Sequence, residues 1–157
     1  MELVRLHRDV KGSARYVEAA TERITAMSER HSGDAAWLSQ TIWNLYSQRS
    51  PFLGLWVGVD QWDNVTAHLV ATVQLWDGGN VAWVHQLENN AGPLTAAIWD
   101  KGMSLLKEWV VTEVNPVLAK QGVSQVRRFL FSTPHDPRFF ERRAGFTVYR
   151  HLMERGL

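Results

Sequence analysis

The stretch that decides the fold is Val126-Arg-Arg-Phe-Leu-Phe-Ser-Thr-Pro-His-Asp-Pro-Arg-Phe-Phe-Glu-Arg-Arg-Ala-Gly-Phe-Thr-Val-Tyr-Arg-His-Leu-Met153. It opens with a β-branched and aromatic run, Val126 to Phe131, which predicts a strand. Asp136 and Pro137 then supply an N-cap and a proline at the first helical position, which predicts a short helix. Gly145 lies where a helix C-cap favours a left-handed residue, and strand-like composition resumes after it.

Upstream of this stretch, the hydrophobic periodicity alternates between helical and strand-like spacing. The expected elements are a strand over Leu3–Leu6, helices from Ser13 and from Asp34, strands over residues 52–59, 66–76 and 81–87, and a helix from Pro93. The turn sequence Asp77-Gly78-Gly79-Asn80 predicts a hairpin. If Asp77 pairs with Asn80, Thr72 lies opposite His85 and Leu87 shares a face with Val70.

Length and composition predict one domain over residues 1–157, because the chain has 157 residues of which 45% are hydrophobic and 21% charged. It contains no cysteine, which excludes disulfides and thiolate chemistry and suits a reducing compartment. No apolar run is long enough to span a membrane, and the amino terminus lacks the apolar core of a signal peptide. We therefore expect a cytoplasmic location, or a place within a virion if the protein comes from a bacteriophage.

The phrase Phe139-Phe140-Glu141-Arg142-Arg143-Ala144-Gly145-Phe146 resembles the carboxy-terminal motif of the GNAT superfamily of N-acetyltransferases. The element order over nearly the whole chain is also similar to that of the superfamily. The order is strand, two helices, three strands, helix, strand, helix, strand. The resemblance implies an α/β fold of the α+β type, with a mixed, mostly antiparallel central sheet and helices on both faces.

The resemblance also implies where a cofactor would bind. In the superfamily, a glycine-rich loop after the fourth strand and the helix that follows it hold the pyrophosphate of acetyl-CoA. The matching stretch here has one glycine, no arginine and an acidic residue, and a proline removes a backbone donor. If the chain binds acetyl-CoA, Asn90, Gly92 and Leu94 would meet the pyrophosphate, and Arg138 or Arg142 would meet the adenosine phosphates.

The catalytic residues that the resemblance implies are also incomplete. Where the superfamily places a tyrosine as general acid, this chain has Phe140 and Glu141. His85 and Glu88, near the end of the fourth predicted strand, are the candidates for the general base. His85 alone is also explained as a hydrogen-bonded strand residue.

These patterns favour a non-catalytic binding or structural module with no cofactor, for example a component of a bacteriophage particle or assembly. The alternative is a divergent, active N-acetyltransferase that uses acetyl-CoA. The eight tryptophans predict a protein partner or a homo-oligomer formed through those that are exposed. Histidine spacing predicts no metal site, and the scattered arginines do not predict a nucleic-acid groove.

Overall fold

The fold is built on one sheet, and the computed structural model describes it over residues 2–30, 35–89, 92, 94–131, 138, 141 and 142. In this part of the chain the strand order is β1-β2-β3-β4-β5. All neighbours are antiparallel except β4 and β5, which are parallel. The strands are β1 (Leu3–Arg5), β2 (Leu53–Val59), β3 (Val65–Trp76), β4 (Gly79–Asn89) and β5 (Phe129–Leu130).

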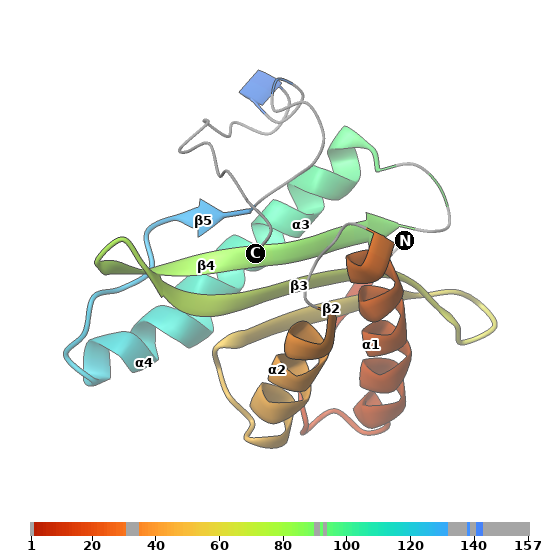
Figure 1. The fold of residues 1–157 in the computed structure, drawn as a ribbon, viewed down its shortest axis with the longest axis horizontal. Coiled ribbons are helices and arrows are strands. Elements are labelled where there is room, and N and C mark those ends of the chain that lie inside the picture. Colours follow the sequence, from red (N-terminus) through yellow and green to blue (C-terminus); the bar gives the residue numbers. More distant parts are fainter. Residues whose placement is uncertain are drawn as a thin grey trace, which may run out of the picture.

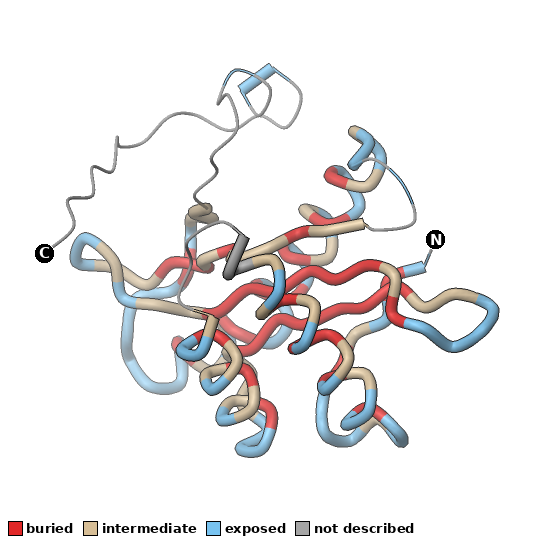
Figure 2. The backbone as a smooth tube through the Cα atoms, turned by 45° about the vertical axis from the view of Figure 1, so that its right-hand side comes forward, coloured by how far each residue is buried: buried red, intermediate tan, exposed pale blue. Residues whose placement is uncertain are grey.

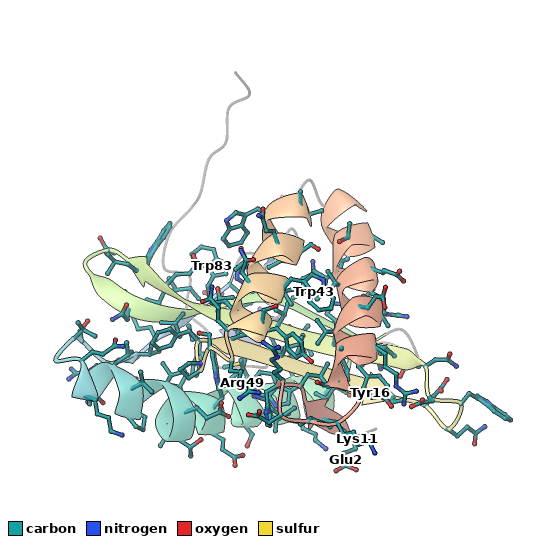
Figure 3. The ribbon with its side chains drawn as sticks, turned by 90° about the horizontal axis from the view of Figure 1, so that it is seen from below. Glu2, Lys11, Tyr16, Trp43, Arg49 and Trp83 are labelled. Atoms are coloured by element: carbon teal, nitrogen blue, oxygen red, sulfur yellow. The ribbon has the colours of Figure 1, made fainter. Side chains whose placement is uncertain are left out.

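Helices cover both faces of this sheet, as predicted (Figure 1). The helical segments are α1 (Ser13–Arg30), α2 (Ala35–Ser47), α3 (Ala96–Trp109), the π-helix η1 (Val110–Val114) and α4 (Asn115–Lys120). Seen from below, α1 and α2 lie on one side of the strands, and the continuous helical stretch from α3 to α4 lies on the other (Figure 3). The central strands are accordingly the most buried part of the chain (Figure 2).

Two apolar clusters form the core, one on each face of the sheet. The cluster under α1 and α2 includes Val17, Ile24, Ile42, Leu55, Val57 and Val70. The cluster under α3, η1 and α4 includes Trp56, Leu69, Leu87, Trp99, Leu106 and Trp109. Alternate residues of β3 enter opposite clusters, which is the period-two pattern of a strand buried on both faces.

The β3–β4 hairpin is present, but its predicted register is wrong. Asp77 and Gly78 form the two-residue turn, with φ angles of 52° and 78°, and Trp76 pairs with Gly79. Two consecutive positive φ angles are those of a type I′ turn, whose twist matches the flanking strands. Thr72 therefore lies opposite Trp83 and not opposite His85.

A β-bulge in β4 changes the register again beyond this point. Ala71 pairs with Val84 and Val70 pairs with Gln86, so His85 is an extra residue in β4 without an opposing partner in the ladder. The bulge turns the residues after it to the other face. Leu87, predicted to share a face with Val70, is instead opposite Leu69 in the cluster under α3.

The helix predicted to begin at Pro93 begins at Ala96. Thr95 is its N-cap, because the Thr95 side chain accepts a hydrogen bond from the backbone N–H of Ile98. Further along, the helix widens into η1 immediately before Pro116, and Asn115 N–H donates to Val110 five residues back. A proline removes one helical donor and crowds the preceding turn, and a π-turn accommodates both effects.

The strand predicted over Val126–Phe131 is shorter in the structure, since only Phe129 and Leu130 belong to β5. Side chains replace the ladder before it: Asn115 donates to the carbonyl of Val126 and accepts from its N–H. Arg138, Glu141 and Arg142 are helical, in agreement with the predicted short helix. The predicted final strand, the Asp34 cap and Pro93 lie outside the described residues.

Candidate functional site

The bulge residue His85 is held by two side chains of β3. Its Nε2 lies 2.8 Å from Thr72 Oγ1 and 3.4 Å from Gln74 Nε2, and Gln74 also donates to Thr72 over 3.0 Å. An amide nitrogen only donates, so His85 Nε2 must be the acceptor and its proton sits on Nδ1. The Thr72 hydroxyl then donates to the same Nε2. The lone pair with which this ring could take a proton is already engaged.

Burial also makes His85 a weak base. Removal from water lowers the pKa of His85 to about 4, because the charged imidazolium loses its hydration. The ring of Trp37, on α2, packs near the imidazole with 5.7 Å between ring centroids. His85 is therefore neutral at pH 7.

A second histidine, His68 on β3, lies fully buried on the same face of the sheet. Its Nε2 donates to Gln86 Oε1 over 2.8 Å, and Gln86 Nε2 donates to the Ile24 carbonyl over 3.2 Å, which ties β4 to α1. Burial lowers the pKa of His68, while the bond to Gln86 and the nearby Glu88 carboxylate oppose that shift. Glu88 Oε2 lies 3.7 Å from His68 Nδ1, and the Glu88 side chain is 17% exposed.

These side chains form two neighbouring groups between the sheet and the helices α1 and α2, which together we call the β4 polar row. One group is His85 with Thr72 and Gln74, and the other is His68 with Gln86 and Glu88. The row contains both predicted base candidates, His85 and Glu88. Buried polar groups of this kind rigidify a core when they satisfy one another, and they weaken it when they do not.

The predicted cofactor-binding residues are placed only in part. Gly92 is exposed, and a Cβ built on it would meet just Asn89 Nδ2, at 4.0 Å. Leu94 is 36% exposed, and Arg138 and Arg142 are exposed on the short helical segment. Asn90 lies outside the described residues. The roles of all five toward acetyl-CoA stay predictions.

The pairing between β4 and β5 is short. β5 pairs only with Ala82 and Trp83, so β4 continues from Val84 to Asn89 without a neighbouring strand on that side in the described part of the chain. On the α3 side of this edge, the rings of Trp99 and Phe131 pack with centroids 5.7 Å apart. An aromatic pair therefore lies between the start of α3 and the end of β5.

Four members of the row, His68, Thr72, Gln74 and Gln86, are not among the site residues that the sequence predicts. A signal for three of them is present in the sequence, because His68, Thr72 and Gln74 recur at even spacing within the mostly apolar strand 65–76. Such spacing places them on one face. Their contact with His85 depends on the bulge, which the sequence does not indicate.

Two other classes of site find no support in the part of the chain that the structure describes. No three His, Asp or Glu side chains there gather as metal ligands would. No helix there combines the length and the apolar character needed to cross a membrane.

No protein-family model matches the sequence, and no curated protein is significantly similar to it. Solved structures are similar along the whole chain. A possible acetyltransferase from Clostridium difficile 630 is 12% identical with a TM-score of 0.60, and the match covers 99% of this chain and 97% of that one. A probable acetyltransferase is 10% identical with a TM-score of 0.58, with 100% and 97% covered.

A third similar structure is the ribosomal-protein-alanine N-acetyltransferase of Brucella melitensis biovar Abortus 2308. It is 10% identical with a TM-score of 0.53, and the match covers 99% of this chain and 100% of that one. At sequence identities this low, the similarity is evidence for a shared fold only. Together with the observed element order and sheet topology, they show that this chain has a divergent GNAT fold.

Proposed function

We propose that this GNAT-fold protein is a binding or structural module that does not transfer acetyl groups. The observation that carries the proposal is the state of His85 Nε2, which accepts hydrogen bonds from Thr72 and Gln74. A general base must reach the proton of the substrate and have a pKa near the working pH. The Nε2 of His85 is directed at Thr72 and Gln74, and the pKa of His85 is lowered to about 4, so His85 meets neither requirement.

The start of α3 supports the same proposal. A helix amino terminus binds phosphate through N–H groups that lack partners inside the helix. Here the Thr95 side chain already accepts from Ile98 N–H, which uses one of those donors. His85 and the α3 cap are thus both engaged by groups of the chain itself.

A protein partner or a second copy of the chain is the expected ligand of such a module. Trp62 is 75% exposed and Trp37 is 48% exposed, whereas Trp56, Trp99 and Trp109 are buried. The loop that carries Trp62 is held in shape by Asp60, whose carboxylate accepts from Trp62 N–H over 2.8 Å and from Asn64 N–H over 2.9 Å. An exposed tryptophan on an ordered loop loses little entropy on binding. The role in a bacteriophage particle stays a prediction.

An active N-acetyltransferase is the second candidate, and the bulge that bends β4 at His85 favours it. In this case Glu88, which is partly exposed, would be the base, and Gly92 and Leu94 would be the first cofactor contacts to test.

Titration calorimetry of the full chain with acetyl-CoA and with CoA tests the proposal. We expect no micromolar binding that depends on Gly92. Micromolar binding that is lost in Gly92→Asp and kept in Gly79→Asp would overturn it, because Gly79 lies at the β3–β4 turn away from the α3 start and a side chain there meets nothing within 4 Å. An acetyl-transfer assay with Glu88→Gln would then identify the base.

A further inference from the structure

A cavity of about 400 Å³ lies at the β1 edge of the sheet, and β2 and β3 separate it from β4. The end of β1 and the loop after it, the end of α2, the start of β2 and Glu113 of η1 form its walls. Figure 3 shows Arg49 below the end of α2, near the loop that carries Lys11. Its charged lining residues are Arg5, Arg8, Asp9, Arg49 and Glu113, and His7 and Tyr46 also line it. We call it the arginine cavity.

The lining has more cations than the carboxylates beside them can neutralise. Glu113 pairs with Arg5 at 3.0 Å, and Asp9 pairs with Arg49 at 3.5 Å. Arg8 has no carboxylate partner among the described residues and donates through Nη1 to the Ser47 carbonyl. A guanidinium has five N–H donors, so Arg8 keeps donors for a further acceptor. His7 lies 3.9 Å from Asp9 and adds positive charge when it is protonated.

Arg5 is engaged by the protein itself. Its Nη atoms donate to the Leu53 carbonyl and to Glu113, and its guanidinium lies over the Trp56 ring, 4.9 Å from the ring centroid. Its Nε has no hydrogen-bond partner in the described part of the chain, but this atom is buried and presents no surface to the cavity. The excess charge that a ligand can reach therefore lies on Arg8 and Arg49.

Arg49 occupies a backbone position that favours glycine. Its φ is 53°, its N–H donates to the Tyr46 carbonyl, and the N–H of Ser50 donates to the Leu45 carbonyl. This is a Schellman motif at the end of α2, in which the left-handed residue is usually glycine. A left-handed arginine is disfavoured by about 1 kcal/mol. The exposed ion pair between Arg49 and Asp9 offsets little of this free-energy cost.

We propose that the arginine cavity binds a small oxyanion, a carboxylate or a phosphate group, through Arg8 and Arg49 with His7 beside them. Arginine suits this role because its planar donors match two oxygens of a carboxylate or phosphate. The bound oxyanion supplies the acceptor that Arg8 lacks. It also gives the left-handed arginine at position 49 a function. The proposal does not depend on whether the chain transfers acetyl groups.

Thermal unfolding of the full chain tests the proposal, with sodium phosphate or sodium succinate added and sodium chloride adjusting the ionic strength to a constant value. We expect one of the two anions to raise Tm saturably, by about 3–5 °C at ten times its dissociation constant. A response to phosphate assigns a phosphate ligand, and a response to succinate assigns a carboxylate ligand.

Two variants and a matched control make the result specific. Arg49→Gly should unfold at the same or a higher temperature without ligand, because glycine fits the left-handed position, yet the anion should no longer raise its Tm. Arg8→Gln should also lose the response. Arg15→Gln is the control, because Arg15 is as exposed as Arg49, at 63%, and also pairs with a carboxylate.

The proposal is overturned if neither anion acts beyond chloride. It is equally overturned if Arg49→Gly and Arg8→Gln respond as the unmodified chain does. Because Arg49→Gly is expected to remain folded, a lost response in that variant cannot be attributed to unfolding.

Discussion

The β4 polar row and the arginine cavity are both groups of polar side chains, and they differ in exposure and in charge. In the row, His85, Gln86 and Thr72 bond to other side chains of the row or to the backbone of α1, although the buried Nδ1 of His68 has no hydrogen-bond partner in the described part of the chain. In the cavity, Arg8 is exposed and has no carboxylate partner among the described residues. Buried polar side chains that bond to one another stabilise a fold, whereas exposed cations with unused donors are available to a ligand.

This difference predicts opposite consequences of mutation. Changes in the row should alter stability, and changes in the cavity should alter ligand binding while leaving stability nearly as it is.

The largest effect is expected for His68→Ala. The substitution leaves a void at a fully buried position and removes the donor to Gln86, so the free energy of unfolding should fall by about 3 kcal/mol. Urea denaturation measures it. His7→Ala is the control, because the His7 side chain is 51% exposed, and its effect should be negligible. Equal effects of the two variants would contradict a structural role for the row.

Lowering the pH should destabilise the protein through His85 and His68. Both pKa values are lowered in the fold, that of His85 to about 4, so the unfolded chain binds more protons than the fold as the pH drops below 6.5. Stability is then full above pH 6.5, and through His85 it falls by up to about 1.4 kcal/mol per pH unit as the pH drops toward 4. Denaturation measured across this pH range should show that the free energy of unfolding depends less steeply on pH in His85→Gln than in the unmodified chain. An unchanged slope would mean that His85 is not buried as a neutral ring.

An intermediate effect is expected for Thr72→Val, which keeps the shape of the side chain and removes its hydroxyl. His85 Nε2 then loses its shorter hydrogen bond, and the free energy of unfolding should fall by about 1–2 kcal/mol. Chemical denaturation measures the change, with Thr112→Val, at an exposed position of η1, as the matched control. If Thr72→Val is neutral, Thr72 does not hold His85 Nε2, and the lone pair of that nitrogen is free to act as a base.

The smallest effect on stability is expected for Arg8→Gln in the arginine cavity. Arg8 is exposed and donates a hydrogen bond to the Ser47 carbonyl, so the free energy of unfolding should change by less than about 0.5 kcal/mol. Chemical denaturation in chloride buffer measures it. A loss above about 1.5 kcal/mol would show that Arg8 holds α2 to the loop after β1, and that the cavity is part of the structural framework.

The order of elements as far as β5 and the two-sided core could be predicted from the sequence. The spacing of apolar residues along α1 and β3 is enough to predict these features, because it distinguishes a helix from a strand and shows which residues share a face. Periodicity does not predict which strand residues oppose each other. The Asp77-Gly78 turn and the bulge at His85 decide that register, and both depend on pairing between strands.

Hydrogen bonds made by side chains explain where the observed ends of α3 and β5 differ from the predicted ones. The Thr95 cap, and not Pro93, determines where α3 begins, and Asn115 takes the backbone groups of Val126 that would otherwise have extended β5. The arginine cavity joins residues 5–9 to residue 49 and residue 113, a grouping that only the tertiary structure reveals. The candidate base residues could be found from the sequence, but their hydrogen-bonded state could not.

An NMR titration of the isotopically labelled chain with acetyl-CoA tests most directly whether this fold has lost its cofactor site, because amide shifts report where a ligand binds. We predict that the amides from Val84 to Asn89 and that of Gly92 do not move. Any shift caused by the cofactor's phosphates should fall near Arg8 and Arg49 and should disappear in Arg49→Gly. Saturable shifts along Val84–Asn89 and at Gly92 would contradict the proposed loss of acetyl transfer and establish β4 as a cofactor site.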